Sequence, residues 1–166
     1  MLNLFFILAA TAALAADQWL KHWITANLPL GQTRPLLPGF VQLRTVHNYG
    51  AAWSSFSGQR WLLLIVTTII VLAVAYCLVR RIVRHPLGFS ACCLIISGGI
   101  GNIIDRARYG YVVDMFDFQF MSYPVFNVAD MCIVVGAILA AIYYMWIYEK
   151  YDKKEANDGD SDAPTE

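Results

Sequence analysis

Acidic residues are nearly absent from most of this chain. Its first 148 residues contain no glutamate and only five aspartates, while the other seven acidic residues fall within the last 18 positions. The five aspartates lie inside or beside long apolar runs, where an ionisable group is costly and marks a candidate functional site. Carboxylate chemistry in this part of the chain must therefore use a short set of residues: Asp17, Asp105, Asp114, Asp117 and Asp130.

Charge of either sign is also scarce. Of the 166 residues, 14% are charged and 58% are hydrophobic, against about 25% and about 45–50% in soluble domains. The apolar residues form blocks instead of alternating, which indicates an integral membrane protein. Blocks at 62–79, 87–104 and 128–148 each match a hydrocarbon core of about 30 Å and predict three spans.

The first apolar block has two interpretations. Leu2 to Ala16, followed by Asp17, resembles a secretory signal peptide with a small-residue cleavage site. However, no basic residue precedes this run, and apolar character resumes after Asp17, which favours an uncut first span over about 4–25. In a continuous helix, Asp17 and Lys21 are four positions apart and can form a structural pair.

Four spans place both termini on the same side of the membrane. The connection 80–86 is rich in arginine and lysines follow the last span, so the positive-inside rule places both termini in the cytoplasm. The segments 26–61 and 105–127 then lie outside. Residues 149–166 are expected to form a disordered acidic cytoplasmic tail, and deletion of residues 152–166 is expected to leave activity largely intact.

Cysteine and histidine show no ligand pattern. The four cysteines lie within predicted spans, no CxxC occurs, and the three histidines are scattered singly, so neither a disulfide framework nor a metal site is predicted. No serine has a spacing that links it to Lys21, which disfavours a Ser/Lys dyad.

Both outer segments have features of folded structure. The stretch 36–53 is rich in β-branched and aromatic residues and predicts short strands at the membrane surface. Its Asn48-Tyr49-Gly50-Ala51-Ala52-Trp53-Ser54 run allows close backbone approach beside an amide that both donates and accepts, although the residues alone favour an ordinary glycine-containing turn.

The second outer segment carries two aspartates on a predicted strand from Val112 to Phe120. Asp114 shares the parity of Phe116 and would face the apolar side, whereas Asp117 would face water. An apolar setting raises a carboxyl pKa and suits a proton donor, so Asp114 is a candidate acid.

Asp130 begins the last span. Asn127 is a candidate helix N-cap, and Asp130 at the third helical position would complete a capping box, which is the structural alternative. The same position favours the ionised form that a general base needs. Together Asp114 and Asp130 suit an aspartic hydrolase whose two carboxyl groups share one proton. Arg106, next to Asp105 at a helix end, is a candidate for orienting a carboxylate or a substrate carbonyl, or for anchoring at lipid headgroups.

These residues together resemble the bacterial lipoprotein signal peptidase (signal peptidase II) family. The resemblance covers nearly the whole chain. It is carried by five pieces in order: Asp17-Gln18 with Lys21, Asn48 to Ser54, Gly101-Asn102-Ile103-Ile104-Asp105-Arg106, Val112-Val113-Asp114, and Phe126-Asn127-Val128-Ala129-Asp130. Leu20, where the family usually has serine or threonine, and Met131, where a small or hydroxylated residue is common, depart from the pattern and put only local packing in doubt.

The resemblance implies the fold and the activity. The fold class is an all-α membrane protein, a four-transmembrane-helix bundle with a small extracytoplasmic β-cradle and a retained first helix. The activity is that of an aspartic endopeptidase that cleaves diacylglyceryl-modified prolipoproteins just before the lipidated cysteine. The location is the bacterial cytoplasmic (inner) membrane, with the site on its extracytoplasmic face. The implied partners are these substrates and the lipid bilayer. We expect no cofactor, metal or nucleic-acid partner, and a monomeric protein.

The resemblance also implies roles for individual residues. The catalytic pair falls on Asp114 and Asp130. Substrate-binding positions fall on Asn48, Asn102, Arg106 and Asn127, and structural support on Asp17, Lys21, Gly50 and Asp105. The alternatives are a small proton-coupled transporter, which predicts acids near the bilayer midplane and paired broken helices, and a non-enzymatic membrane scaffold.

Overall fold

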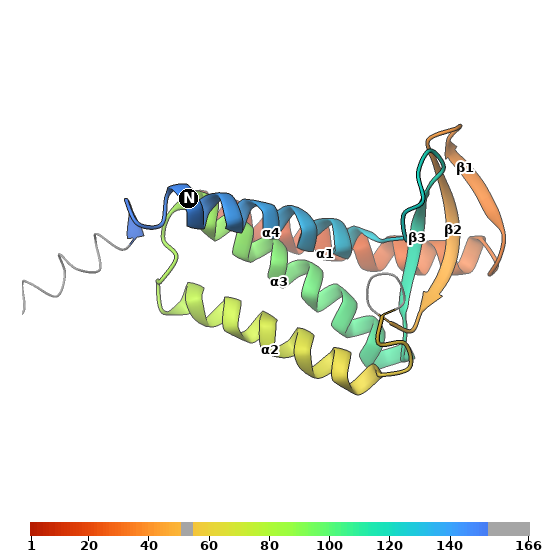
Figure 1. The fold of residues 1–166 in the computed structure, drawn as a ribbon, viewed down its shortest axis with the longest axis horizontal. Coiled ribbons are helices and arrows are strands. Elements are labelled where there is room, and N and C mark those ends of the chain that lie inside the picture. The colour runs from red at the N-terminus through yellow and green to blue at the C-terminus, as the bar shows by residue number, and fades with distance from the viewer. Residues whose placement is uncertain (51–54, 153–166) are drawn as a thin grey trace, which may run out of the picture.

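A computed structural model describes residues 1–50 and 55–152 as four helices and a three-stranded sheet. The helices lie lengthwise beside one another, and the sheet covers one end of them, hereafter the sheet end (Figure 1). All four helices are long and apolar enough to cross a membrane. The predicted bundle with its small sheet is confirmed. The elements are α1 (Leu2–Asn27), β1 (Thr33–Leu37), β2 (Val41–Asn48), α2 (Arg60–Val79), α3 (Pro86–Tyr109), β3 (Val112–Phe118) and α4 (Val128–Trp146).

Helix α3 is the central helix of the bundle. Half of the residues in its most apolar 18-residue stretch are buried, whereas much smaller fractions are buried in the corresponding stretches of the other three helices. Glycines permit this close packing, as small residues do between membrane helices. A Cβ atom at Gly101 would lie 2.8 Å from Asp17 Oδ2, and one at Gly98 would collide with the Ala129 carbonyl oxygen. These glycines therefore bring α1 and the first turn of α4 against α3.

Local signals set both ends of α3. His85 is the N-cap, and its Nδ1 accepts a hydrogen bond from the Leu87 amide at 3.2 Å, while Pro86 occupies the first turn. At the other end, Gly110 has a φ of +84° and ends the helix in the left-handed conformation. The chain then turns directly into β3, so the end of α3 determines where that strand begins.

The sheet is antiparallel in the order β1-β2-β3. Asn48 pairs with Val112 and Val46 with Asp114, so Asn48 and Asp114 lie diagonally on one face. On the opposite face, Val113 and Met115 pack against Ile24 and Leu28 near the end of α1. The strand β3 is thereby held between α1 and the site that Asp114 faces.

Asp117 differs from the expectation of a solvated side chain. It accepts a hydrogen bond from Gln42 Nε2 at 2.8 Å and lies 3.9 Å from Arg44 Nη1, with its side chain 14% exposed. The two β2 side chains shield it from water. Asp117 is thus a cross-strand contact on the face of β3 away from Asp114.

The packed chain extends beyond the predicted start of the tail at 149. Asp152 is 4% exposed and accepts hydrogen bonds from the amides of Arg84 and His85 and from the Tyr143 hydroxyl. These contacts attach the end of the described chain to the α2–α3 connection. Within the segment predicted to be a tail, Asp152 is therefore a residue that packs against the bundle, because its carboxylate accepts from these groups.

Candidate active site

Asp114 and Asp130 line one cavity of about 350 Å³ at the sheet end. Asp114 comes from β3 and Asp130 from the first turn of α4, and Asn48, Asn102 and Arg106 line the same cavity. The rest of the lining is largely apolar and includes side chains of α2, α4 and the segment before α4. The cavity thus places two carboxyl groups beside a surface suited to an apolar ligand.

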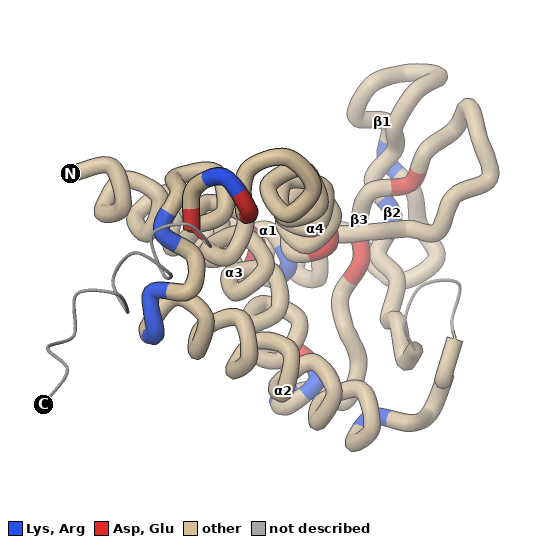
Figure 2. The backbone as a smooth tube through the Cα atoms, turned by 60° about the vertical axis from the view of Figure 1, so that its left-hand side comes forward, with Lys and Arg blue, Asp and Glu red and all other residues tan. Residues whose placement is uncertain are grey.

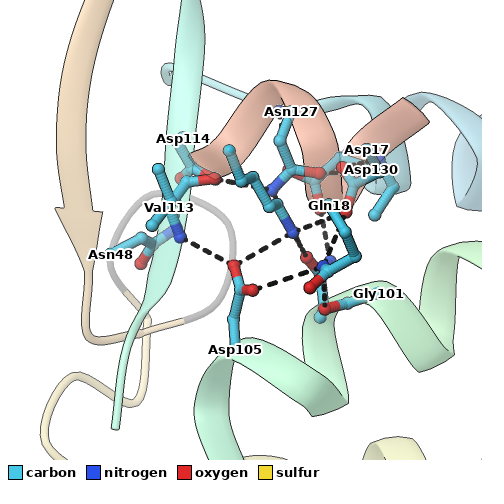
Figure 3. Close-up of polar contacts among 12 residues, drawn as sticks. Asp17, Gln18, Asn48, Gly101, Asp105, Val113, Asp114, Asn127 and Asp130 are labelled. Atoms are coloured by element: carbon cyan, nitrogen blue, oxygen red, sulfur yellow. Dashed lines mark hydrogen bonds and ion pairs between the residues drawn. The ribbon is translucent and has the colours of Figure 1, made fainter. Parts of the chain in front are cut away.

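Asn127 connects the two carboxyl groups. Its Nδ2 donates to Asp114 Oδ1 at 2.7 Å, and its backbone amide donates to Asp130 Oδ2 at 3.2 Å (Figure 3). Its Oδ1 accepts from the Asp130 amide at 2.8 Å. One residue therefore fixes both acids, and the helix cap orients its amide group so that the NH₂ faces Asp114.

The Asp114 carboxyl group is 1% exposed and is held by amide donors. In addition to Asn127, Asn48 Nδ2 donates to its Oδ2 at 2.9 Å. Burial, followed by the charge of Asp130, raises the pKa of Asp114 to about 7, while the two asparagine donors and Lys21 oppose the increase. The elevated pKa agrees with the expectation from strand parity.

Asp130 serves the helix cap and the site at the same time. The predicted capping box is present, with Asp130 Oδ2 accepting from the Asn127 amide. Its other oxygen, Oδ1, accepts from Asn102 Nδ2 at 2.8 Å. The structural interpretation of Asp130 is therefore correct, and it leaves the second oxygen beside the cavity.

Behind the two acids lies a buried ion cluster built on Lys21. Its ammonium group lies 2.9 Å from Asp17 Oδ2 and 3.0 Å from Asp105 Oδ2, and it donates to Asn102 Oδ1 at 3.1 Å. These three contacts match the three donors of an ammonium group. Lys21 therefore orients Asn102 so that its NH₂ group faces Asp130, and the predicted Asp17–Lys21 pair is confirmed.

The same cluster joins four elements. Asp17 Oδ1 accepts from the Ala129 amide of α4 at 2.8 Å, and Asp105 Oδ2 accepts from the Val113 amide of β3 at 3.0 Å. Gln18, which was noted only as a neighbour of Asp17, donates to Asp17 Oδ2 and to the Gly101 carbonyl. Its adjacency to Asp17 was the only signal for its part in this network.

Arg106 and Gly50 hold the loop after β2 against α3. Arg106 Nη2 donates to the Gly50 carbonyl at 2.9 Å, and the Gly50 amide donates to Asn48 Oδ1 at 2.9 Å. This chain of contacts directs the Asn48 NH₂ group to Asp114. Residues 51–54 of the motif lie outside the described residues.

A second cavity of about 440 Å³ adjoins the first. It shares Asn48 and Asp114 with it, and its lining is more polar and includes Ser57 and Ser122. The two cavities therefore meet at Asp114, one with a mainly apolar lining and the other with a lining that is polar and apolar in similar measure. Such a pair can hold an extended chain across the carboxyl groups.

The described residues contain no group of three histidine, cysteine or acidic side chains placed to hold a metal ion. The fold and the site define a four-helix membrane protein with a candidate hydrolytic centre built on two carboxyl groups. Residues 9–146 match the family described as Signal peptidase (SPase) II. The chain therefore belongs to the signal peptidase II family, a family of bacterial membrane proteases.

Curated relatives agree with this assignment. The lipoprotein signal peptidase of Lactococcus lactis subsp. cremoris (strain MG1363) is 40% identical over 142 residues, which cover 86% of this chain and 94% of that protein. The lipoprotein signal peptidase of Enterococcus faecalis (strain ATCC 700802 / V583) is 37% identical over 162 residues, covering 96% and 95%.

Solved structures share the fold. A bacterial membrane enzyme solved by the in meso method at 2.3 Å matches with a TM-score of 0.81 and 29% identity, covering 98% of this chain and 93% of that one. A second, solved at 1.9 Å, matches with a TM-score of 0.79 and 31% identity over 86% of this chain and 94% of that one.

Proposed function

We propose that this protein is an aspartic endopeptidase that removes signal peptides from diacylglyceryl-modified prolipoproteins, cleaving before the lipidated cysteine. The substrate class follows from the relatives, which are lipoprotein signal peptidases. The observation that carries the aspartic mechanism is the arrangement of Asp114 and Asp130, which line one cavity and both accept hydrogen bonds from Asn127.

In the proposed reaction, the two acids play different roles. Asp130 removes a proton from a water molecule, whose oxygen attacks the scissile carbonyl carbon. Protonated Asp114 donates to the carbonyl oxygen and stabilises the charge that develops there. The tetrahedral intermediate then collapses, and a proton moves to the departing amine of the cysteine. No covalent enzyme intermediate forms, and the shared proton belongs to the pair.

The neighbouring polar residues have positioning roles in this proposal. Asn127 and Asn48 hold Asp114, and Asn102 holds Asp130, through the contacts given above. Arg106 fixes the loop that carries Asn48 and lies beside the cavity, where it can also contact substrate. Asp17, Lys21, Gly50 and Asp105 support these residues from behind.

The apolar lining suggests how the lipidated substrate is held. The side chains of α2 and α4 that line the first cavity would contact the diacylglyceryl chains or the apolar signal peptide within the bilayer. Basic residues gather at the α2–α3 connection, away from the sheet (Figure 2). By the positive-inside rule this end and both termini would face the cytoplasm, and the site the opposite side.

The alternative of a proton-coupled transporter finds less support. It requires acidic groups near the bilayer midplane and interrupted helices. Asp114 instead lies on a strand at the sheet end, where β3 joins α3 to α4. A non-enzymatic scaffold would not need the asparagine donors directed at both acids.

The proposed function is tested by cleavage of a lipidated precursor peptide in detergent. The variants Asp114→Asn and Asp130→Asn should each lose several orders of magnitude in turnover. Asp117→Asn is the matched control, because it makes the same change on the same strand but on the opposite face. Near-normal turnover by either site variant would refute the pair, and equal cleavage of an unlipidated precursor would refute recognition of the lipid.

A further inference from the structure

A further cavity in the described part of the chain is lined by neither Asp114 nor Asp130 and shares His47 with the second cavity. It has a volume of about 570 Å³ and lies between the last turns of α1 and α3 and the strands β2 and β3. We call it the rear cavity and define it by His22, Thr25, His47, Arg108 and Tyr111. Val113 lines it, whereas Asp114 faces the active site, so the two cavities lie on opposite faces of β3.

The donors that remain available in the rear cavity are those suited to an anion. Lys21 also lines it, but its three donors are engaged by Asp17, Asp105 and Asn102. The hydroxyl of Thr25 donates to the backbone of α1. Among the residues that the structure describes, no hydrogen bond engages the side chains of Arg108, His22 or His47.

The charged residues that line the rear cavity are Lys21, Asp105 and Arg108. Asp105 shares the Lys21 ammonium group with Asp17, at 3.0 Å and 2.9 Å, and accepts from the Val113 amide. Arg108 has no acidic partner within the described chain and only rests on the ring of Tyr109, with its Cζ 5.2 Å from the ring centroid. Arg108 is therefore the cation of this lining that is left to contact a ligand, and a guanidinium group suits phosphate oxygens.

The position of the rear cavity corresponds to the depth of lipid headgroups. It lies at the ends of two membrane-spanning helices, and His22 and Arg108 at its edge are both exposed. Trp19 and Tyr109 lie exposed on the same two helices. Tryptophan and tyrosine concentrate at membrane interfaces, where headgroup phosphates lie.

We propose that the rear cavity binds the phosphate group of an anionic phospholipid from the surrounding membrane. Arg108 supplies the charge, the rings of His22 and His47 supply N–H donors, and the acyl chains lie along the exposed face of α1. Burial lowers the pKa of His47, so this ring acts as a neutral donor at physiological pH. The C-terminal ends of α1 and α3 disfavour an anion, so binding depends strongly on Arg108.

Native mass spectrometry of the intact protein in detergent tests this proposal, with dioleoyl-phosphatidylglycerol and dioleoyl-phosphatidylcholine as probes. The wild type should retain the anionic lipid in preference to the zwitterionic one. Arg108→Gln should weaken retention of the anionic lipid about tenfold, since it removes one charge-assisted hydrogen bond. His22→Gln should weaken retention of the anionic lipid about threefold. If Arg108→Gln does not fold, the comparison of His22→Gln with the wild type tests the proposal.

Arg34→Gln is the matched control. It removes the same charge from β1, whose residues are exposed and do not line the rear cavity. Equal losses from both arginine variants would show a general charge effect and overturn the proposal, as would equal retention of the two lipids. Full displacement by millimolar inorganic phosphate would overturn the lipid assignment in favour of a free phosphate site. Because no substrate is present, these results are independent of the proposed peptidase function.

Discussion

At the residue scale, Asn127 has the most consequential position in the proposed site. Its Oδ1 caps α4 while its Nδ2 donates to Asp114 at 2.7 Å, so one amide group connects helix geometry to the state of a carboxyl group. The capping box was predictable from the spacing of Asn127 and Asp130. The contact with Asp114 was not, because a strand-borne partner thirteen positions away leaves no local pattern.

Two substitutions at Asn127 separate its roles. Asn127→Ser keeps an N-cap oxygen but loses the amide donor, whereas Asn127→Ala loses both. We expect the alanine variant to be about 1 kcal/mol less stable than the serine variant, and both to lose about tenfold or more in turnover. Thermal unfolding and peptide cleavage measure these effects. Full activity of the serine variant would show that the donor to Asp114 is dispensable.

The pKa of Asp114 predicts the pH dependence. Since burial and Asp130 raise this pKa to about 7, the protonated acid that the mechanism needs is present below that pH and is lost above it. kcat/KM should therefore fall as the pH rises through about 7. Asn48→Ala removes a donor that favours the carboxylate, so it should move this decline to higher pH. An unchanged pH profile in that variant would contradict the role given to Asn48.

At the element scale, apolar run length predicted the number and order of the helices but not their ends. Helix α2 begins at Arg60 and α3 continues to Tyr109, so both include charged residues that the predicted spans left out. The ends of α3 instead follow from His85, Pro86 and Gly110. Charge marks where a helix leaves the hydrocarbon core, whereas capping decides where the helix stops.

The packing of these elements depends on the Lys21 cluster. Lys21→Met would leave Asp17 and Asp105 buried without their counterion, at a cost of about 3–5 kcal/mol. We expect a strongly lowered unfolding midpoint in detergent. Adding Asp105→Asn to this variant removes one of the two uncompensated charges and should restore part of the stability. A midpoint that stays at the wild-type value in Lys21→Met would show that this cluster does not hold the helices together.

At the scale of the whole molecule, the two ends of the bundle are closed by different means. The sheet and the ion cluster close one end, and Asp152 closes the other by accepting from the amides of Arg84 and His85. The sequence indicated a solvated tail from residue 149 onward because acidic and basic residues are concentrated there. A composition rule cannot identify a buried carboxylate such as Asp152 in such a segment.

Truncation distinguishes the buried residue from those that follow it. A chain that ends at Asp152 should keep its activity and unfolding midpoint, whereas a chain that ends at Tyr151 should unfold at a lower temperature, since the amides of Arg84 and His85 lose the carboxylate that accepts from them. Asp152→Asn in the full chain tests the carboxylate alone and should lower the midpoint by less. Equal midpoints for the two truncated chains would show that the Asp152 contacts contribute nothing to stability.

The central claim is that Asp114 and Asp130 act as one unit. Single-turnover cleavage of a lipidated precursor peptide by the wild type, Asp114→Asn, Asp130→Asn and the double variant tests it most directly. Residues that act together show strongly non-additive losses. The account predicts that each single variant loses about three orders of magnitude or more, and that the double variant is no slower than the slower single one. Losses that multiply in the double variant, or a single variant that cleaves at nearly the wild-type rate, would contradict it.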